Sequence, residues 1–328
     1  MSTKSEVIFK VKSLKKWFTT RRGLFDSLTG KQEYVRAVDN ISFEICKHEV
    51  VCMVGESGSG KTTAARLILR LEDPTEGQIL YKGNDIAKEK QSELRKLRRH
   101  MQMVFQDPYE SLDPRMTIFE IVSEPLRVIK ICPRSEIPIR VMKALEDVGL
   151  IPASDFSIRF PHELSGGQRQ RVSIARALIL NPEFIIADEP ASMLDANTRI
   201  EILNLLLDLQ VRYKMGILFI THDLAQARYL GHRIIILYLG KIVEQGEVEL
   251  VIKSPHHPYT KALISNIPVP DPEAKRERIE IEGEIPTAIQ LPPGCRFSPR
   301  CPYAFERCKE EEPELMMKHG RLSACWLD

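Results

Sequence analysis

The sequence has no apolar run long enough to cross a bilayer, and residues 1–12 lack the apolar core of a signal peptide. We therefore expect a protein that stays in the cytosol. In that compartment the seven cysteines favour free thiols or metal ligands over disulfides. The formal net charge is only +2, which gives no reason to expect nucleic acid as the main partner.

Internal repeats, low-complexity tracts and heptad runs are also missing. The 328 residues are enough for two domains, or for one large domain and a tail. Strand and helix patterns alternate up to about residue 250, so we predict an α/β fold. The part from about residue 107 to residue 176 lacks strand patterns and predicts a helical subdomain. Prolines and four cysteines after residue 250 predict a proline-rich arm and a small cysteine-motif domain over residues 251–328.

Some of these patterns are distinct enough to place single elements. Residues 118–129 and 137–148 have helical patterns within the predicted subdomain. Residues 233–239 and 241–244 predict a hairpin that turns at Gly240.

The stretch Gly55 to Thr62 reads Gly-Glu-Ser-Gly-Ser-Gly-Lys-Thr and lies between a strand pattern, residues 50–54, and a helical pattern, residues 61–71. This is the setting in which such a stretch binds phosphates. The glycines let backbone N–H groups converge on a phosphate, and the helix start adds unpaired donors. Lys61 would reach the β- and γ-phosphates, and the Thr62 hydroxyl would bind Mg²⁺. The alternative is a merely flexible loop, which the flanking strand and helix disfavour.

Two carboxylates, Asp188 and Glu189, follow the apolar run of residues 184–187. A buried parallel strand delivers such groups to its carboxyl end, where ligands bind in open α/β sheets. Asp188 would hold Mg²⁺ through water, and Glu189 would polarise the water that attacks the γ-phosphate. The alternative is an acidic helix start before Pro190, which the presence of the phosphate loop disfavours.

Two further polar residues, His222 and Gln106, end apolar strand patterns. His222 would contact the γ-phosphate, although a single histidine at a strand end is more often structural. Gln106 would bind Mg²⁺ or the attacking water, whereas many such residues only cap turns. The candidate catalytic residues are therefore Glu189, His222 and Gln106, and the candidate Mg²⁺ ligands are Thr62, Gln106 and Asp188.

The run Leu164-Ser165-Gly166-Gly167-Gln168 precedes a helical pattern over residues 169–180. Ser165 and Gln168 have the spacing of a capping box, which would explain them without any ligand. The two glycines would in addition expose helix-start amides to an anion outside the helix.

With these motifs in one chain, residues 1 to about 250 resemble the ATP-binding subunits of ABC transporters. The resemblance implies a P-loop (RecA-like) core with an inserted helical subdomain and an antiparallel β subdomain. It also implies a head-to-tail dimer that sandwiches two ATP molecules, in which Leu164–Gln168 covers the γ-phosphate held by the partner subunit. Ser192 to Asp195 would be the loop that crosses this interface.

The same resemblance completes the set of nucleotide contacts. Thr63 would join the phosphate contacts, and Phe18 stands where the family stacks an aromatic ring on adenine. The neighbouring Trp17 is an alternative for that stacking, and an aromatic at this place can also simply pack on a sheet edge. The predicted ATP contacts are Phe18, Gly55, Glu56, Ser57, Gly58, Ser59, Gly60, Lys61, Thr62 and Thr63. The predicted contacts in trans are Leu164, Ser165, Gly166, Gly167 and Gln168.

The four cysteines near the C-terminus are Cys295, Cys301, Cys308 and Cys325. Their spacing, C-x₅-C-x₆-C-x₁₆-C, is not a common zinc-finger pattern. It is similar to the C-terminal cysteine motif of the oligopeptide/dipeptide importer ATPases, which residues 257–263 and 267–272 also resemble. This resemblance implies a [4Fe–4S] cluster on four thiolates. A tetrathiolate Zn²⁺ site and four unliganded thiols are the alternatives.

The resemblance to this subfamily implies an ATP-hydrolysing subunit of an importer for oligopeptides or dipeptides, peripheral on the cytoplasmic side of the cell membrane. It would close on a homologous second ATPase and drive two membrane subunits, with cargo delivered by an extracytoplasmic solute-binding protein. The polar residues 19–36 resemble the second of the two ATPase subunits in such importers. Related importers carry oligosaccharides or nickel, so the cargo stays open. A soluble ABC ATPase acting on nucleic acid or the ribosome is the alternative of another class, and the single phosphate loop disfavours it.

Overall fold

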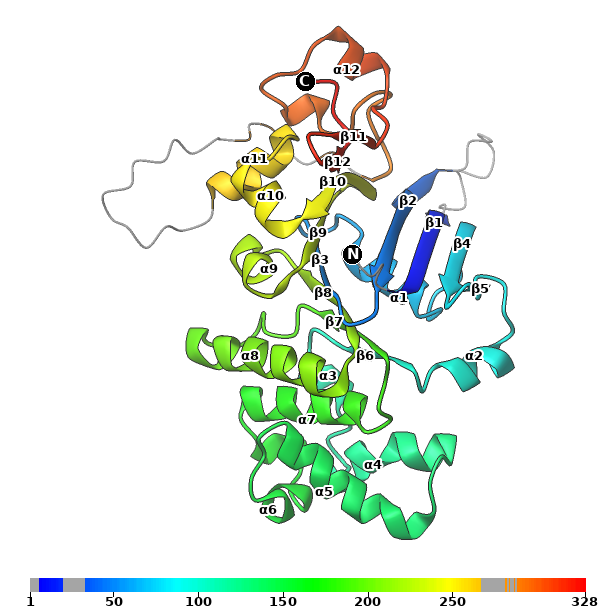
Figure 1. The fold of residues 1–328 in the computed structure, drawn as a ribbon, viewed down its shortest axis with the longest axis vertical. Coiled ribbons are helices and arrows are strands. Elements are labelled where there is room, and N and C mark those ends of the chain that lie inside the picture. The colour runs from blue at the N-terminus through cyan, green and yellow to red at the C-terminus, as the bar shows by residue number, and fades with distance from the viewer. Residues whose placement is uncertain (1–5, 20–32, 267–280, 282, 284–285, 287) are drawn as a thin grey trace, which may run out of the picture. The chain divides into compact units, whose positions relative to one another are not determined.

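The computed structural model describes residues 6–19, 33–266, 281, 283, 286 and 288–328 (Figure 1). The chain divides into two compact units, each assembled from separate stretches of sequence. The first unit takes the described residues of Met1–Ile8, Ile45–Val50 and Glu89–Ile220, and the second takes those of Phe9–Glu44, Val51–Lys88 and Thr221–Asp328. Most of the polar stretch 19–36, and the proline-containing motif 267–272, lie outside the described residues.

The first unit contains parallel strands in the order β8-β7-β6. Their bounds are Gly216–Thr221 for β8, Phe184–Asp188 for β7 and Met101–Val104 for β6. Every residue of β7 and β8 is buried, as is usual for parallel strands that are covered on both faces. Because parallel strands end at the same edge, the residues that follow β6 and β7 lie close together.

Between β6 and β7 the chain is helical, which confirms the helical patterns at residues 118–129 and 137–148. The central helix of this region is α7, which contacts α3, α4, α5 and α8. The side chains of Thr117 and Glu120 form a capping box at the start of α4. The helices of the first unit are α2 (Gln91–Leu97), α3 (Pro108–Ser111), α4 (Ile118–Ile129), α5 (Ile137–Asp147), α6 (Ala153–Ser157), α7 (Gly166–Leu178) and α8 (Ala196–Tyr213), with short 3₁₀ turns at Arg134–Glu136 and Pro161–Glu163.

The second unit contains two groups of strands. One is ordered β2-β1-β4-β5, with bounds Tyr34–Cys46, Val7–Thr19, Glu76–Tyr81 and Asn84–Asp85. The other is ordered β11-β12-β10-β9-β3, with bounds Met316–Lys318, Arg321–Ser323, Lys241–Glu247, Arg233–Tyr238 and Val50–Val54. The pair β3–β9 is parallel, and the pairs from β9 to β11 are antiparallel. Parallel strands alternate with helices along the chain, in the order β7, α8, β8, α9 (Leu224–Leu230) and β9, which confirms the α/β class.

The predicted hairpin is formed by β9 and β10, and it turns at Gly240 as expected. Leu239 and Gly240 both have positive φ, 42° and 78°, which is the backbone twist that tight hairpins require. The helices of the second unit are α1 (Lys61–Ile68), α9 (Leu224–Leu230), α10 (Val248–Lys253), α11 (Pro258–Ser265) and α12 (Glu306–Glu310), with a 3₁₀ turn at Ser298–Arg300. In the part of the chain that the structure describes, no helix combines the length and the apolar character that a membrane span requires.

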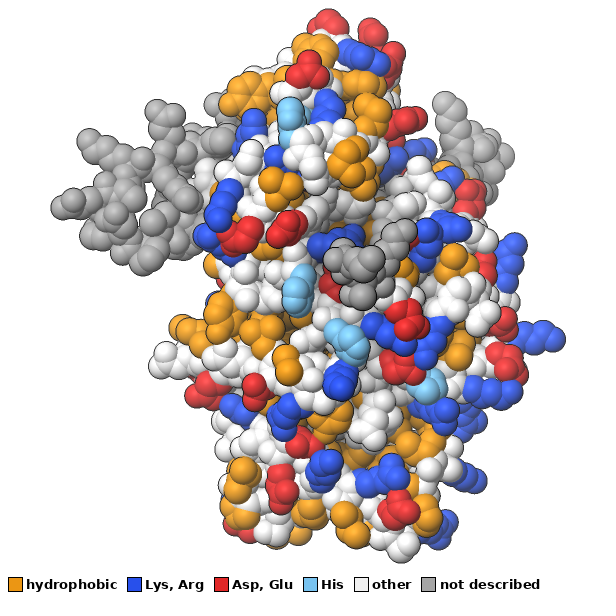
Figure 2. All heavy atoms as spheres, viewed as in Figure 1, with side chains coloured by type: hydrophobic (Ala, Val, Ile, Leu, Met, Phe, Trp, Pro, Cys, Tyr) orange, Lys and Arg blue, Asp and Glu red, His pale blue; other side chains and the backbone are white. Residues whose placement is uncertain are grey.

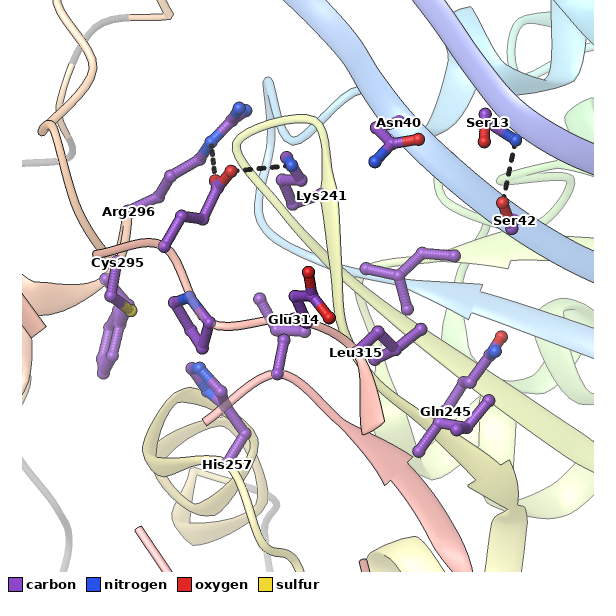
Figure 3. Close-up of a pocket in the computed structure, with 17 residues that line it drawn as sticks. Ser13, Asn40, Ser42, Lys241, Gln245, His257, Cys295, Arg296, Glu314 and Leu315 are labelled. Carbon is purple, nitrogen blue, oxygen red and sulfur yellow. Dashed lines mark hydrogen bonds and ion pairs between the residues drawn. The ribbon is translucent and has the colours of Figure 1, made fainter. Parts of the chain in front are cut away.

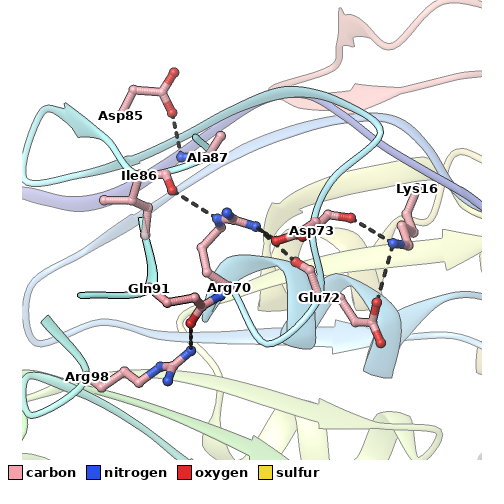
Figure 4. Close-up of polar contacts among 9 residues, drawn as sticks. All are labelled: Lys16, Arg70, Glu72, Asp73, Asp85, Ile86, Ala87, Gln91 and Arg98. Atoms are coloured by element: carbon pink, nitrogen blue, oxygen red, sulfur yellow. Dashed lines mark hydrogen bonds and ion pairs between the residues drawn. The ribbon is translucent and has the colours of Figure 1, made fainter. Parts of the chain in front are cut away.

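The far end of α1 is held by a buried arginine, as Figure 4 shows. Arg70 donates from Nε to the Ile86 carbonyl oxygen at 2.9 Å and pairs with Asp73 at 2.5 Å. Lys16 Nζ adds a bond to the Asp73 carbonyl oxygen at 2.7 Å. These bonds join the segment after α1 to strand β1 and to the residue that follows β5, so the helix that follows the phosphate loop is fixed at its carboxyl end.

The described part of the C-terminal tail is continuous with the second unit, because β12 pairs with β10. A cavity of about 590 Å³ lies beside this pairing (Figure 3). Glu312 on its wall pairs with Arg296 Nε at 3.0 Å and with Lys241 Nζ at 2.8 Å. Arg296 also pairs with Asp39. The charges around the cavity therefore satisfy one another, and they anchor the tail to β10 and β2.

Candidate functional site

The phosphate loop of the second unit runs from the buried strand β3 to the first turn of α1. Gly60 caps α1 with a φ of 103°, and Gly58 has a φ of 76°. Both values lie in the region that favours glycine. A Cβ atom on Gly60 would lie 2.1 Å from the Ala37 carbonyl oxygen, so no side chain fits there. The Ser59 carbonyl accepts a hydrogen bond from the Gly240 N–H at 2.8 Å. The loop thus has the backbone conformation that a phosphate cradle needs.

Lys61 and Ser59 contribute side chains to this cradle. Lys61 is 6% exposed, and its Nζ donates to the carbonyl oxygens of Gly55 and Glu56 at 2.7 and 2.9 Å. The Ser59 hydroxyl is buried and has no hydrogen-bond partner among the described residues. Buried polar groups of proteins nearly always have a partner, and a phosphate oxygen would supply one. The residues present therefore fit a nucleotide phosphate, with Thr62 and Thr63 half-buried in the next turn.

Trp17 and Phe18 at the end of β1 have different surroundings. The Trp17 indole N–H donates to Asp39 at 3.2 Å, and the Arg36 guanidinium lies 4.9 Å from its ring centre. Phe18 is 39% exposed, with Lys16 Nζ 4.8 Å from its ring centre. Trp17 is thus engaged in contacts within the unit, whereas Phe18 keeps ring surface accessible.

In the first unit, Asp188 ends β7 and Glu189 follows it with a φ of 44°. Asp188 is 3% exposed, and Glu189 is half-buried. The Glu189 N–H donates to the Ile220 carbonyl oxygen at 3.0 Å, and the Glu189 carbonyl accepts from the Ser192 hydroxyl at 3.0 Å. Gln106, which follows β6, has its Nε2 3.5 Å from Glu189 Oε2. The structure therefore brings Glu189 and Gln106 together at the carboxyl edge of neighbouring strands.

The Leu-Ser-Gly-Gly-Gln run forms the start of α7, and its predicted capping box is present. The Ser165 hydroxyl accepts from the Gln168 N–H at 3.3 Å, and the Gln168 side chain accepts from the Ser165 N–H at 3.0 Å. Gly167 is buried, and a Cβ atom there would lie 2.4 Å from a methyl carbon of Thr198. Close packing against α8 thus explains Gly167, which differs from the expected exposure of both glycines. Ser165 is exposed and Gly166 half-buried, so this edge of the helix start is accessible.

The loop between β7 and α8 is held at both of its predicted interface residues. Ser192 bonds to Glu189, and Asp195 is the N-cap of α8. The Thr198 hydroxyl donates to the Asp195 carboxylate at 2.7 Å, and this bond lowers the pKa of Asp195 from its ordinary value. His222 belongs to the second unit, where it is exposed directly after β8.

The four C-terminal cysteines line one small cavity of about 20 Å³ in the second unit, with Phe297 and Trp326 among its apolar walls. The Cys295 N–H donates to the Cys308 carbonyl oxygen at 2.8 Å. Burial raises the pKa of the Cys295 thiol to about 11. Within the described residues, no three His, Cys, Asp or Glu side chains are arranged as a preformed metal site. The donor set itself, four thiols around one cavity, is of the kind that iron–sulfur clusters and Zn²⁺ use.

Two residues to which the sequence patterns assigned no role contact the phosphate loop. The Tyr259 hydroxyl oxygen accepts a hydrogen bond from the Glu56 N–H at 3.0 Å. Arg300 Nη1 lies 3.0 Å from Glu56 Oε2. A signal for both was available, since Tyr259 lies in the motif of residues 257–263 and Arg300 directly precedes Cys301.

Comparison with known families matches residues 38–192 to the family described as "ABC transporter". Residues 243–308 match the family described as "Oligopeptide/dipeptide transporter, C-terminal region". The second match covers Tyr259, Arg300 and three of the four cysteines. The two matches confirm the resemblance to ABC transporter ATP-binding subunits and to the oligopeptide/dipeptide group.

Individual proteins agree with the family matches. The chain is 47% identical to the "Probable peptide ABC transporter ATP-binding protein" y4tS of Sinorhizobium fredii, over 98% of this chain and 90% of the relative. It is 46% identical to the "Oligopeptide transport ATP-binding protein" AppF of Bacillus subtilis, over 94% of this chain and 93% of the relative. The chain is also similar to the solved structure of the ATP-binding cassette MJ0796, a dimer in a post-hydrolysis state bound to ADP and phosphate. The TM-score is 0.63 and the sequence identity is 34%, and the match covers 73% of this chain and 98% of that chain. The chain therefore belongs to the ATP-binding subunits of ABC transporters, in the group with the oligopeptide/dipeptide transporter C-terminal region.

Proposed function

We propose that this chain is the ATP-hydrolysing subunit of an importer for oligopeptides or dipeptides. The observation that carries the proposal is the pairing of the two family matches in one chain. Relatives named as peptide and oligopeptide transport ATP-binding proteins, at 47% and 46% identity over nearly the whole chain, support it. The chemistry would be hydrolysis of ATP, and its purpose would be to drive membrane subunits.

In this proposal the phosphate loop binds the nucleotide. The backbone donors of the loop and of the start of α1 bond to phosphate oxygens. Lys61 gives up its hydrogen bonds to the Gly55 and Glu56 carbonyl oxygens and donates to phosphate oxygens instead. The Ser59 hydroxyl gains the partner that it lacks among the described residues.

We propose that Phe18 stacks on adenine, because its ring surface is accessible. A Phe18→Ala variant is then expected to bind ATP more weakly in a titration. Binding as tight as that of the wild type would remove Phe18 from that role.

The hydrolytic residues act on the γ-phosphate end. Glu189 accepts a proton from the attacking water, and its two backbone hydrogen bonds keep its carboxylate in place. Mg²⁺, when bound, would neutralise charge on the phosphates, and Thr62, Gln106 and Asp188 would hold it. We also propose that His222 contacts the γ-phosphate.

The proposed working unit is a dimer with a homologous second ATPase. Leu164–Gln168 of one subunit would cover the nucleotide on the other, and the loop of Ser192 to Asp195 would cross between them. The closed dimer would drive two membrane subunits from the cytoplasmic face, with cargo supplied by an extracytoplasmic binding protein. A dimeric relative bound to ADP and phosphate supports this arrangement.

The proposal is tested by reconstituting the chain with its partner ATPase and two membrane subunits in sealed vesicles. We expect a peptide-loaded binding protein to raise ATP hydrolysis and the peptide to cross the membrane. Replacing the peptide by an oligosaccharide or Ni²⁺ tests the other cargoes. Hydrolysis by the two ATPases that merely equals the sum of their separate rates, with no peptide transport, would contradict the proposal.

A soluble ABC ATPase acting on nucleic acid or the ribosome is the second candidate, and the low formal net charge argues against it. Basic and acidic side chains are interspersed over the face drawn in Figure 2. The formal net charge is +2. A nucleic-acid protein would present a basic stripe or patch to the phosphate backbone.

For the tail we propose a cysteine-motif domain that follows a nucleotide-binding domain, with the boundary near residue 250. Its four cysteines would hold one [4Fe–4S] cluster, which would cross-link a segment too short to build much core of its own. Because ligation requires thiolates, binding would displace the protons that burial favours on Cys295.

The cluster proposal predicts the colour and metal content of the protein. Protein purified without oxygen is expected to be brown and to contain about four iron and four sulfide per chain, the composition of such a cluster. Replacing Cys301 and Cys308 by serine should abolish the brown colour and the bound iron and sulfide. Cys132→Ser, which lies outside the tail, should leave the colour and the iron and sulfide content unchanged. A colourless preparation with about one zinc per chain would favour a tetrathiolate Zn²⁺ site instead.

A further inference from the structure

All three polar groups of Glu56, in the phosphate loop, are engaged. Its N–H donates to the Tyr259 hydroxyl at 3.0 Å, and its carbonyl accepts from Lys61 Nζ at 2.9 Å. Its carboxylate pairs with Arg300 Nη1 at 3.0 Å. Two of these three contacts come from residues beyond 250, which are remote from the loop in sequence. The C-terminal segment therefore determines how this part of the loop is held.

Arg300 reaches the loop from a hydrogen-bonded turn. The 3₁₀ turn Ser298–Arg300 is closed by hydrogen bonds from the Ser298 N–H to the Cys295 carbonyl at 2.9 Å and from the Arg300 N–H to the Phe297 carbonyl at 2.9 Å. The Arg300 side chain is 8% exposed, and its Nη1 also donates to the Tyr238 hydroxyl at 3.3 Å. The guanidinium is therefore aimed at Glu56 by its own turn and by a neighbouring side chain.

Tyr259 is held as firmly as Arg300. It is fully buried on α11, and its ring packs against those of Tyr238 and Phe297, with centroids 4.7 and 5.5 Å away. Ring pairs at such distances fix one another's orientation. The Tyr259 hydroxyl is thus presented to the Glu56 N–H by an aromatic cluster that also contains a residue of the tail.

We infer that Tyr259 and Arg300 are positioning residues for nucleotide binding, which act by holding Glu56 of the phosphate loop. Tyr259 orients the backbone of Glu56, and Arg300 neutralises its carboxylate and keeps it turned toward the tail. This inference rests on the proposal that Gly55–Thr62 binds the phosphates of ATP.

The electrostatic reason is simple. A carboxylate in a loop that binds a polyanion repels the ligand unless a cation neutralises it. Arg300 supplies that cation from a site with little solvent screening. An Arg300→Met variant would leave the Glu56 carboxylate without this partner and free to turn toward the phosphates. Removing one partner of such a pair costs far more than removing both.

The two residues are tested separately in the full-length chain, by titrating ATP–Mg²⁺ and by measuring Tm without nucleotide. Arg300→Met is expected to raise the Kd for ATP about tenfold or more, the effect of losing a hydrogen bond to a charged group. Tyr259→Phe, which removes one oxygen atom, is expected to raise it about fivefold. The matched controls are Arg307→Met and Tyr303→Phe, because both residues are exposed in the same tail. The controls are expected to bind ATP as the wild type does.

A second substitution separates positioning from a general effect on tail folding. Glu56→Gln removes the carboxylate that Arg300 neutralises, so the double variant Glu56→Gln/Arg300→Met should bind ATP more tightly than Arg300→Met. A tail that is merely misfolded would not be rescued by a change in the loop. The inference is overturned if Arg300→Met and Tyr259→Phe bind ATP like their controls, or if the double variant shows no recovery.

A Lys61→Ala variant distinguishes failure of the positioning role from failure of the proposal that Gly55–Thr62 binds the phosphates of ATP. If Lys61→Ala loses ATP while Arg300→Met and Tyr259→Phe retain it, the loop binds phosphates and only the positioning role is wrong. If Lys61→Ala also binds ATP normally, the loop is not the phosphate site and both ideas are wrong.

Discussion

A Glu189→Gln variant is expected to bind ATP as the wild type does and to hydrolyse it at about a hundredth of the rate or less, the scale of losing a general base. The substitution keeps the shape of the side chain and removes its basicity. The backbone of residue 189 is fixed independently of the carboxylate, by the bonds to Ile220 and Ser192. The amide should therefore occupy the position of the carboxylate, and the loss should appear in turnover alone.

The measurement is steady-state ATP hydrolysis together with an ATP titration on the same preparations. Glu201→Gln is the matched control, because Glu201 is an exposed glutamate of the same unit that pairs with Arg171. Near-wild-type turnover by Glu189→Gln would remove Glu189 from the role of base. A large loss in the Glu201→Gln control would show that the assay reports damage to the fold.

The motifs that could be predicted from the sequence are those whose conformation depends on residues close by in the chain. A strand, a glycine turn and a helix in succession are enough to predict the conformation of residues 55–62, and the positive φ of Gly58 and Gly60 agrees with it. The same holds for the capping box of Ser165 and Gln168, which spans a single helical turn. The hairpin at Gly240 belongs to this class as well.

Contacts that depend on tertiary structure could not be predicted in the same way. Tyr259 is 203 residues from Glu56 in sequence, and Arg300 is 244 residues from it. No local pattern specifies which distant side chain a loop will meet, because chain topology decides that. Gly167 is a similar case, since its lack of a side chain is explained by Thr198 on the following helix. The proposal that Phe18 rather than Trp17 stacks on adenine likewise rests on the surroundings of each ring in the structure.

The role of the α7 start in trans leads to a second large effect. Ser165→Arg is expected to leave ATP binding to the isolated chain intact and to reduce hydrolysis to background. Ser165 is exposed at the helix N-terminus, so an arginine there would put bulk and charge where the partner subunit's nucleotide must dock. The substitution also removes an N-cap, which costs about 1 kcal/mol of stability. Ser165→Ala, which loses the cap without adding bulk, is the control for that loss and should retain much of the hydrolysis.

Mixing two inactive variants tests whether Ser165 acts in trans. The test is run without the second ATPase, where this chain is expected to hydrolyse ATP slowly as a homodimer because its own motifs are intact. In such a dimer of Ser165→Arg with Lys61→Ala, one nucleotide site combines the damaged loop with the damaged helix start. The other site combines the intact loop of the Ser165→Arg chain with the intact helix start of the Lys61→Ala chain. Hydrolysis should therefore reappear on mixing, although each variant alone is inactive. If Ser165 acted on the nucleotide of its own chain, neither site in the mixed dimer would be complete, and the mixture would stay as inactive as its components.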